Sequence, residues 1–169
     1  MLIVTGHLNR FDSVIEQPLT HASNLEDRLP AHYTFVRYHM LRGNLREALS
    51  YCSSILRNLG EDIPVDVNSE LIQAEIVKTQ QVLATNWKND DLQGLSRLTE
   101  PMMIWMMKFM AHLVLLYIII KEERAIYVGC LLIQRSVEYG WCSESSMGLY
   151  AFGRGLISVM KNVEEGCYW

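Results

Sequence analysis

The histidines and cysteines are the residues best suited to metal or nucleophilic chemistry, and their spacing assembles neither kind of site. His32 and His39 are seven residues apart, which places them on one face if the segment is helical. Two ligands do not complete a tetrahedral zinc site, and nearby Cys52 falls on the apolar stripe of another predicted helix. We therefore interpret both histidines as packing or surface residues and predict no metal.

The cysteines are scattered along the chain and include no CxxC pair. Disulfide frameworks belong to small secreted chains with dense, patterned cysteines, so we expect reduced thiols and a cytoplasmic protein. Met1 to Val4 is too short to be the apolar part of a secretory signal. No neighbouring sequence marks any of them as a catalytic nucleophile. The four are Cys52, Cys130, Cys142 and Cys167.

The sequence contains no phosphate-binding motif that would indicate a nucleotide site. The chain lacks a GxxxxGK[ST] loop, and the Gly153-Arg154-Gly155 run has no preceding strand. Gly148, Ala151 and Gly155 instead fall on one helical stripe, where small residues admit a neighbouring helix at close range. The net charge is -4, from 15 basic and 19 acidic residues spread through the chain, which does not favour nucleic acid. We predict no cofactor, no nucleic-acid partner and no enzyme activity in this segment.

The spacing of apolar residues predicts an all-α fold. The clearest stripe runs from Asn44 to Leu59, with Asn44 as N-cap and with Gly60 and Pro64 as stop signals. Ala48 and Cys52 lie on this stripe and are expected to pack against another helix. No segment alternates polar and apolar residues over the length of a strand. The other predicted helices cover about residues 11–22 (interrupted by Pro18), 30–42, 69–85, 101–120, 122–139 and 144–161, and residues 87–100 are predicted to form a polar connection.

Several residues have predicted roles within these helices. Pro30 suits a first helical turn, Gly140 suits a C-terminal stop, and Ser143 is a candidate N-cap. In the segment 69–85 we expect an inward apolar face and a charged face turned to water. The inward residues are Ile72, Ile76 and Leu83, and the outward residues are Glu70, Glu75 and Lys78.

The segment 102–120 is long and apolar enough to be a candidate membrane-spanning helix. Trp105 and Tyr117 near its ends resemble the aromatic residues that anchor such helices at the membrane interface. Lys108 and His112 interrupt it, and a lysine near a bilayer centre costs about 2.5 to 3.5 kcal/mol. We therefore favour a buried helix of a bundle, and a membrane-associated fragment with a single span at about 102–120 is the alternative. The methionines of this segment fit core filling better than an adaptable groove. They are Met102, Met103, Met106, Met107 and Met110.

A weak internal repeat accompanies the helices. Aligning the first two stripes pairs Phe11 with Leu45, Val14 with Ala48, and Pro18 with Cys52, an offset of 34 residues. This is the period of the tetratricopeptide repeat, in which a small residue near the middle of the second helix lets the paired helices approach. Ala48 fits that position and Val14 fits it less well, and no residue matches the early tryptophan of the motif.

Four short motifs extend the likeness over about residues 8 to 160: Leu56-Arg57-Asn58-Leu59-Gly60-Glu61-Asp62-Ile63-Pro64, Leu98-Thr99-Glu100-Pro101, Val137-Glu138-Tyr139-Gly140 and Leu149-Tyr150-Ala151-Phe152-Gly153. Their order and spacing resemble the tetratricopeptide-like helical region of large signalling proteins that combine a serine/threonine kinase, an AAA-type predicted ATPase, a GAF domain and a sensor histidine kinase. The resemblance implies a cytoplasmic scaffold between an ATP-driven switch and an output kinase. It implies no active-site residues here, because the catalytic motifs of that family lie outside such a segment.

Together these observations predict antiparallel helix pairs stacked as a tetratricopeptide-like α-solenoid with an incomplete first repeat. The family usually has a proline-containing break that Leu113 to Ile120 lacks, so one longer helix is expected there. We expect a non-catalytic scaffold that contacts neighbouring domains of the same polypeptide or a signalling partner. The predicted regions are 1–64 (N-terminally truncated helix pairs), 65–100 (a helix and the polar connection) and 101–169 (a C-terminal helical repeat region). The predicted helix-packing residues are Ala48, Cys52, Gly148, Ala151 and Gly155.

Overall fold

The computed structural model describes residues 24–86 and 96–169, and within these ranges it contains helices and no strand. The all-α prediction is therefore confirmed for this part of the chain. The stripe predicted at 11–22 and residues 87–95 of the polar connection lie outside the described residues. The helices are α2 (Leu25–Leu41), α3 (Leu45–Asn58), α4 (Ser69–Asn86), α5 (Pro101–Ile119), α6 (Arg124–Tyr139), α7 (Ser145–Ser158) and α8 (Val163–Tyr168).

Helix α2 begins five residues earlier than predicted. The Asn24 side chain accepts a hydrogen bond of 2.8 Å from the Asp27 amide, and Glu26 and Asp27 place negative charge in the first turn. These features start the helix before Pro30, which lies in its interior and not in its first turn. The cap and the acidic turn outweigh the preference of proline for the first helical position.

The predicted helix ends are confirmed at two glycines, and of the two predicted N-caps Asn44 occupies the N-cap position of α3 whereas Ser143 is not the N-cap of α7. Gly60 and Gly140 have φ angles of +91° and +119°, which only glycine adopts readily, and they close α3 and α6. Asn44 makes no side-chain capping bond. Ser143 does not cap α7, because its hydroxyl donates to Glu144 while Ser145 Oγ accepts from the Cys142 amide at 3.1 Å.

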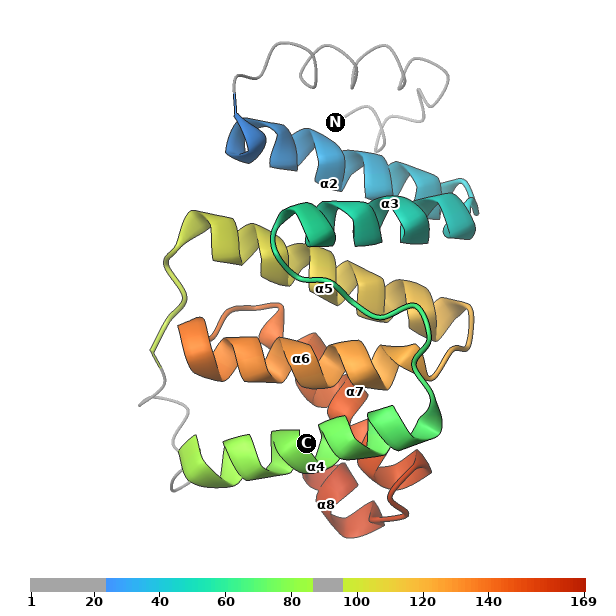
Figure 1. Cartoon of the computed structure of the whole chain (residues 1–169), viewed down its shortest axis with the longest axis vertical. Coiled ribbons are helices and arrows are strands. Elements are labelled where there is room, and N and C mark those ends of the chain that lie inside the picture. The colour runs from blue at the N-terminus through green and yellow to red at the C-terminus, as the bar shows by residue number, and fades with distance from the viewer. Residues whose placement is uncertain (1–23, 87–95) are drawn as a thin grey trace.

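The helices stack in an order that differs from their order in the chain (Figure 1). From one end, α2 and α3 form an antiparallel hairpin, and α5 and α6 form a second hairpin that contacts α3 through α5. Helix α4 contacts α6 and α7 and, among the described helices, touches neither α3 nor α5. The connection from α3 to α4 therefore crosses in front of α5, and α4 runs in the same direction as α6.

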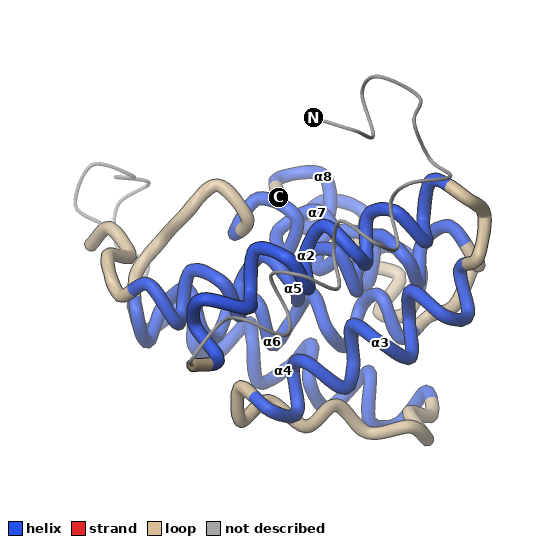
Figure 2. Tube along the Cα trace, turned by 90° about the horizontal axis from the view of Figure 1, so that it is seen from above, coloured by secondary structure: helices blue, strands red, loops and turns tan. Residues whose placement is uncertain are grey.

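Seen from above, α7 and α8 lie on the opposite side of the stack from α3 and α4 (Figure 2). The six-residue helix α8 was not predicted. Asn162 caps it by accepting from the Glu165 amide at 3.2 Å, and its glycine packs on α7. A methyl group on Gly153 of α7 would come within 2.8 Å of the Gly166 carbonyl oxygen. Glycine at both positions therefore allows the two backbones to touch.

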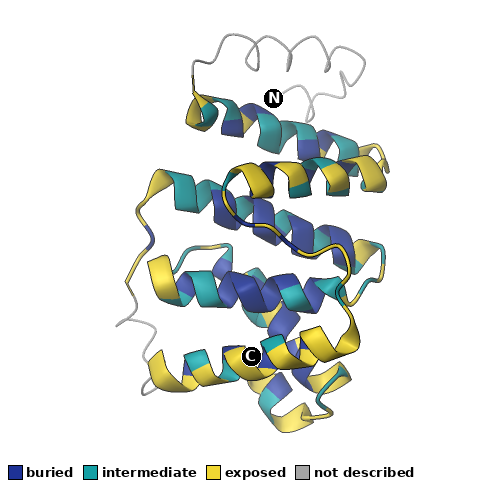
Figure 3. Cartoon of the chain, viewed as in Figure 1, coloured by how far each residue is buried: buried dark blue, intermediate teal, exposed yellow. Residues whose placement is uncertain are grey.

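Helix α5 lies in the centre of the stack and carries much of the core (Figure 3). Met106, Met107 and Met110 are at most 3% exposed, which confirms core filling for these three methionines. Among the described residues, one helix, Pro101–Ile119, is long and apolar enough to cross a membrane, and half of its apolar window is buried. Lys108 and His112 lie on its less buried side, where the Lys108 ammonium rests 4.4 Å from the centre of the Trp105 ring.

Candidate functional site

The stripe of small residues predicted on α7 lies directly against α6. A methyl group on Gly148 would stand 3.1 Å from the Gly129 carbonyl oxygen, and Ala151 fills the space above Gly129. Gly155 faces Ile126 of α6, and a methyl group at position 155 would lie 2.5 Å from an Ile126 side-chain carbon, which is too close for a side chain. The sequence-based prediction named the α7 residues and missed Gly129. A glycine inside an apolar helical stripe was the available signal for that partner.

Ala48 and Cys52 are fully buried on α3, where α3 meets α5. The Cys52 thiol donates a hydrogen bond of 3.3 Å to the Phe109 carbonyl oxygen of α5. Burial raises the pKa of Cys52 well above its usual range, and it raises the pKa of Cys130 to about 12. Both thiols therefore remain protonated at neutral pH, which makes them packing residues and poor nucleophiles.

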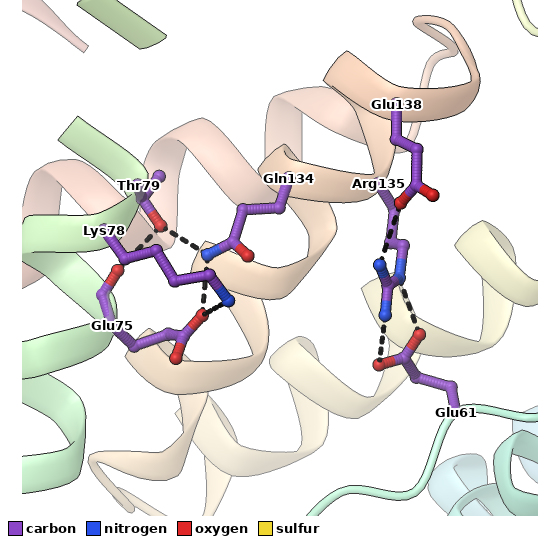
Figure 4. A network of polar contacts seen from close by, with 7 residues as sticks. All are labelled: Glu61, Glu75, Lys78, Thr79, Gln134, Arg135 and Glu138. Carbon is purple, nitrogen blue, oxygen red and sulfur yellow. Dashed lines mark hydrogen bonds and ion pairs between the residues drawn. The ribbon is translucent and has the colours of Figure 1, made fainter. Parts of the chain in front are cut away.

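A polar network joins α4 to α6 (Figure 4). The side-chain amide of Gln134 donates to Glu75 Oε1 at 2.7 Å and to Thr79 Oγ1 at 2.9 Å. Lys78 Nζ donates to the same Glu75 oxygen at 3.1 Å. The expectation that Glu75 faces water is wrong, since its side chain is 14% exposed. The carboxylate instead satisfies an amide from a helix 59 residues further along the chain.

The next residue of α6, Arg135, ties the same helix to the connection after α3 (Figure 4). Its guanidinium donates to both oxygens of Glu61, at 2.8 and 3.2 Å, and to Glu138 at 2.9 Å. The hydrogen bonds that Arg135 donates to Glu61, ahead of the opposing effect of burial, raise the pKa of Arg135. Glu61 is 7% exposed, so this two-point contact holds a nearly buried carboxylate in place.

Two of the four short motifs that carried the sequence resemblance, the one that begins at Leu98 and the one that ends at Gly140, meet in space. Leu98 donates its amide to the Trp141 carbonyl at 3.0 Å, and Trp141 donates to Ser96 at 2.8 Å. A methyl group on Gly140 would lie 2.7 Å from the Leu98 amide nitrogen, so this approach requires glycine.

The two histidines singled out from the sequence do not form a metal site. His32 Nδ1 lies 2.6 Å from the Tyr51 hydroxyl, and burial, then the charge of Arg28, lowers the pKa of His32. The His39 ring packs against Phe35, and its Nδ1 is buried without a hydrogen-bond partner. Among residues 24–86 and 96–169, no group of three potential ligands is placed to hold a metal ion.

Three surface hollows lie on the described part of the molecule. One, of about 470 Å³, lies between α2 and α3, and a second of about the same volume follows the outer face of α4. The third, of about 270 Å³, lies between α3, the connection after it and the start of α6. It is lined by Leu49, Ser50, Ser53, Ser54, Arg57, Ile63, Pro64, Val65, Tyr117 and Arg124.

Comparisons of the chain with protein-family models, with curated proteins and with solved structures find no match. The described residues define a helical protein whose polar side chains fasten helices to one another. The surfaces described above are therefore the starting point for its function.

Proposed function

We propose that this chain is a non-catalytic helical-repeat scaffold that holds neighbouring domains of a signalling polypeptide, or a separate signalling protein, through the outer face of α4. One observation carries the proposal: α4 has apolar residues on two faces and buries only one of them. Ile72 and Ile76 are at most 2% exposed against α6 and α7, whereas Leu71 is 44% exposed and Val77 38% exposed.

The outer face of α4, much of which is exposed in Figure 3, has the chemistry of a shallow protein-binding surface. Ala74 and Val77 form an apolar centre, with Glu70 and Lys78 beside them as charged edges. An apolar strip with a charged rim suits the apolar stripe of a partner helix. A single exposed valine or leucine is ordinary on a protein surface, but here Val77 and Ala74 lie together over the hollow and Leu71 is exposed on the same helix.

The stacking of antiparallel hairpins also supports the scaffold. Hairpins α2/α3 and α5/α6 pack side by side, as successive pairs do in an α-solenoid. The position of α4 against α6 breaks that order, and we propose that the solenoid has been modified so that α4 presents a free face. The burial of half of the apolar window of α5 supports the scaffold over the membrane-associated alternative.

Site-specific photo-crosslinking tests the proposal. A photo-reactive amino acid at Val77, in cells that express the full polypeptide, should give a defined protein adduct whose mapped site repeats between experiments. The matched control is the same residue at Val163, which is 59% exposed on α8. Adducts that form equally at both positions, or only to lipid, contradict a scaffold that acts through α4.

A variant that introduces a charge sharpens the same test. Val77→Lys places an ammonium in the apolar centre and leaves the inner face of α4 untouched, so the fold should be retained. We expect loss of the adduct formed from a second probe at Ala74, while Val163→Lys leaves that adduct unchanged. Retention of the adduct in Val77→Lys, with the fold verified by circular dichroism, contradicts the proposal.

A further inference from the structure

The pocket between α3, the connection after it and α6 has the composition of an anion site. Its ten lining residues include two arginines, three serines and no acidic residue. The carboxylates of Asp62 and Glu122 pair with these two arginines but are not among the lining residues, so the wall of the pocket itself carries cationic groups and no carboxylate. Serine hydroxyls and guanidinium groups are the donors that proteins use for phosphate oxygens.

One of the two arginines is already held in place. Arg124 donates to the Val65 carbonyl oxygen at 3.2 Å, and its guanidinium lies 4.7 Å from the centre of the Tyr117 ring. Its side chain is 24% exposed. A guanidinium fixed by a carbonyl and an aromatic ring loses little further freedom when an anion binds, which favours affinity.

The carboxylates that now neutralise the arginines are replaceable. Arg57 pairs with Asp62 at 3.0 Å, and these side chains are 61% and 72% exposed. Arg124 pairs with Glu122, which is 37% exposed. The exposed Arg57–Asp62 pair contributes about 0 to 1 kcal/mol, so an anion that carries two charges can displace Asp62. Arg124 and Glu122 are 24% and 37% exposed, and at this partly buried pair the anion competes with a closer contact.

The size of the pocket limits the ligand. Its volume of about 270 Å³ is below the range of about 300 to 1,000 Å³ typical of whole small-molecule sites. A single phosphorylated side chain fits such a space better than a nucleotide does. Pro64 and the 73% exposed Val65 stand beside the arginines and offer apolar contact to the residues that flank such a side chain.

We propose that this pocket binds a phosphate monoester, with Arg57 and Arg124 holding the phosphate oxygens and Ser53 donating a hydrogen bond. The phosphate comes either from a phosphorylated protein side chain or from a free phosphate compound. The inference goes beyond the scaffold proposed above, because phosphate binding here requires no contact at α4.

Isothermal titration calorimetry of the purified chain tests the proposal with three probes: inorganic phosphate, O-phosphoserine and an end-blocked pentapeptide with a central phosphoserine. We expect saturable binding that weakens about tenfold or more in the double variant Arg57→Gln/Arg124→Gln. The control is Arg154→Gln, which removes an exposed arginine of α7 and should bind as the unchanged chain does. Equal loss in the control means non-specific charge attraction and overturns the proposal.

Two further variants keep the test decisive if the double variant fails to fold. Ser53→Glu keeps both arginines and fills the pocket with a carboxylate, so it should abolish binding while the circular dichroism spectrum is unchanged. Asp62→Asn removes a competing carboxylate and should tighten binding about two- to fivefold. Unaltered binding in folded Ser53→Glu overturns the proposal, as does the absence of saturation by any probe.

The probes also separate the two sources of phosphate. Tighter binding of the phosphopeptide than of inorganic phosphate, by about tenfold or more, identifies a phosphorylated protein segment as the ligand. Equal affinity for all three probes identifies a free phosphate compound. Val77→Lys should leave every one of these affinities unchanged, so failure of the scaffold at α4 and failure of the phosphate pocket give different results.

Discussion

Helix α6 makes two kinds of contact, and the contrast between them explains how this molecule is held together. Toward α7 it presents Gly129, and the two helices approach so closely that no side chain fits at position 129. Toward α4 and the connection after α3 it presents Gln134 and Arg135, whose long side chains reach carboxylates on those elements. The contact of α6 with α7 depends on the lack of a side chain at Gly129. The contacts of α6 with α4 and with the connection after α3 include side-chain hydrogen bonds. They should therefore respond differently to substitution.

The largest expected effect is at the glycine contact. Gly129→Val places side-chain atoms where Ala151 already lies, so α7 must move away from α6. We expect a loss of about 3 kcal/mol in the free energy of unfolding, measured by urea denaturation. Ala74→Val adds the same group type to the exposed face of α4 and should cost less than about 0.7 kcal/mol. Similar losses in the two variants would contradict a sterically defined α6/α7 contact.

The next effect is at Arg135. Arg135→Met keeps the apolar stem but leaves Glu61, which is 7% exposed, without its two hydrogen bonds. We expect a loss of about 2 kcal/mol in the free energy of unfolding. Arg57→Met removes the exposed pair with Asp62 and should change stability by less than about 0.5 kcal/mol. If both variants lose the same small amount, the Glu61 contact is no stronger than an ordinary surface pair.

A smaller loss is expected at Gln134. Gln134→Ala removes two hydrogen bonds to α4, but Lys78 still satisfies Glu75, so the cost should be about 1 kcal/mol. A double-mutant cycle with Thr79→Val measures the coupling between the two residues. The exposed Gln73→Ala is the control on α4. A coupling energy near zero would mean that shape, and not hydrogen bonding, holds α4 against α6.

The smallest effect concerns the pH dependence of stability and His112 on the central helix α5. Burial lowers the pKa of His112, ahead of the opposing effect of its hydrogen bond to the Lys108 carbonyl. A lowered pKa means that the folded state resists protonation, so stability is present above pH 6.5 and is lost as the pH falls below it. His112→Gln should reduce this loss by up to about 1 kcal/mol between pH 7 and pH 5. Thermal unfolding at each pH measures this loss. An equal loss of stability in the unchanged chain and in His112→Gln would show that groups other than His112 cause it.

The periodicity of apolar residues predicted most of the described helices, because each helix has at least one face of recurring large side chains. The ends were predicted where glycine was required, as at Gly60 and Gly140. The start of α2 was missed because a capping asparagine and two acidic residues count for more than the proline inside the helix. The sequence signal for α8 is its N-cap, Asn162. Asn162 lies so close to the end of α7 that it was not interpreted as the start of another helix.

The contacts between helices were harder to predict than the helices. The small residues of α7 are visible as a stripe, yet their partner could be found only from the position of Gly129 within another helix. The hydrogen bonds of Glu75 and Glu61 join residues 59 and 74 positions apart, and no local pattern encodes which helix a carboxylate will meet. The order of stacking, with α4 against α6, was likewise invisible to an interpretation based on consecutive pairs.

The placement of α4 has a consequence for synthesis of the chain. Helix α4 leaves the ribosome before the helix that covers it, since α6 ends about 50 residues later. At about 5 to 20 residues per second, Ile72, Ile76 and Leu83 wait for several seconds with their apolar face uncovered. During that interval the apolar face of α4 is open to chaperones and to premature association with other nascent chains.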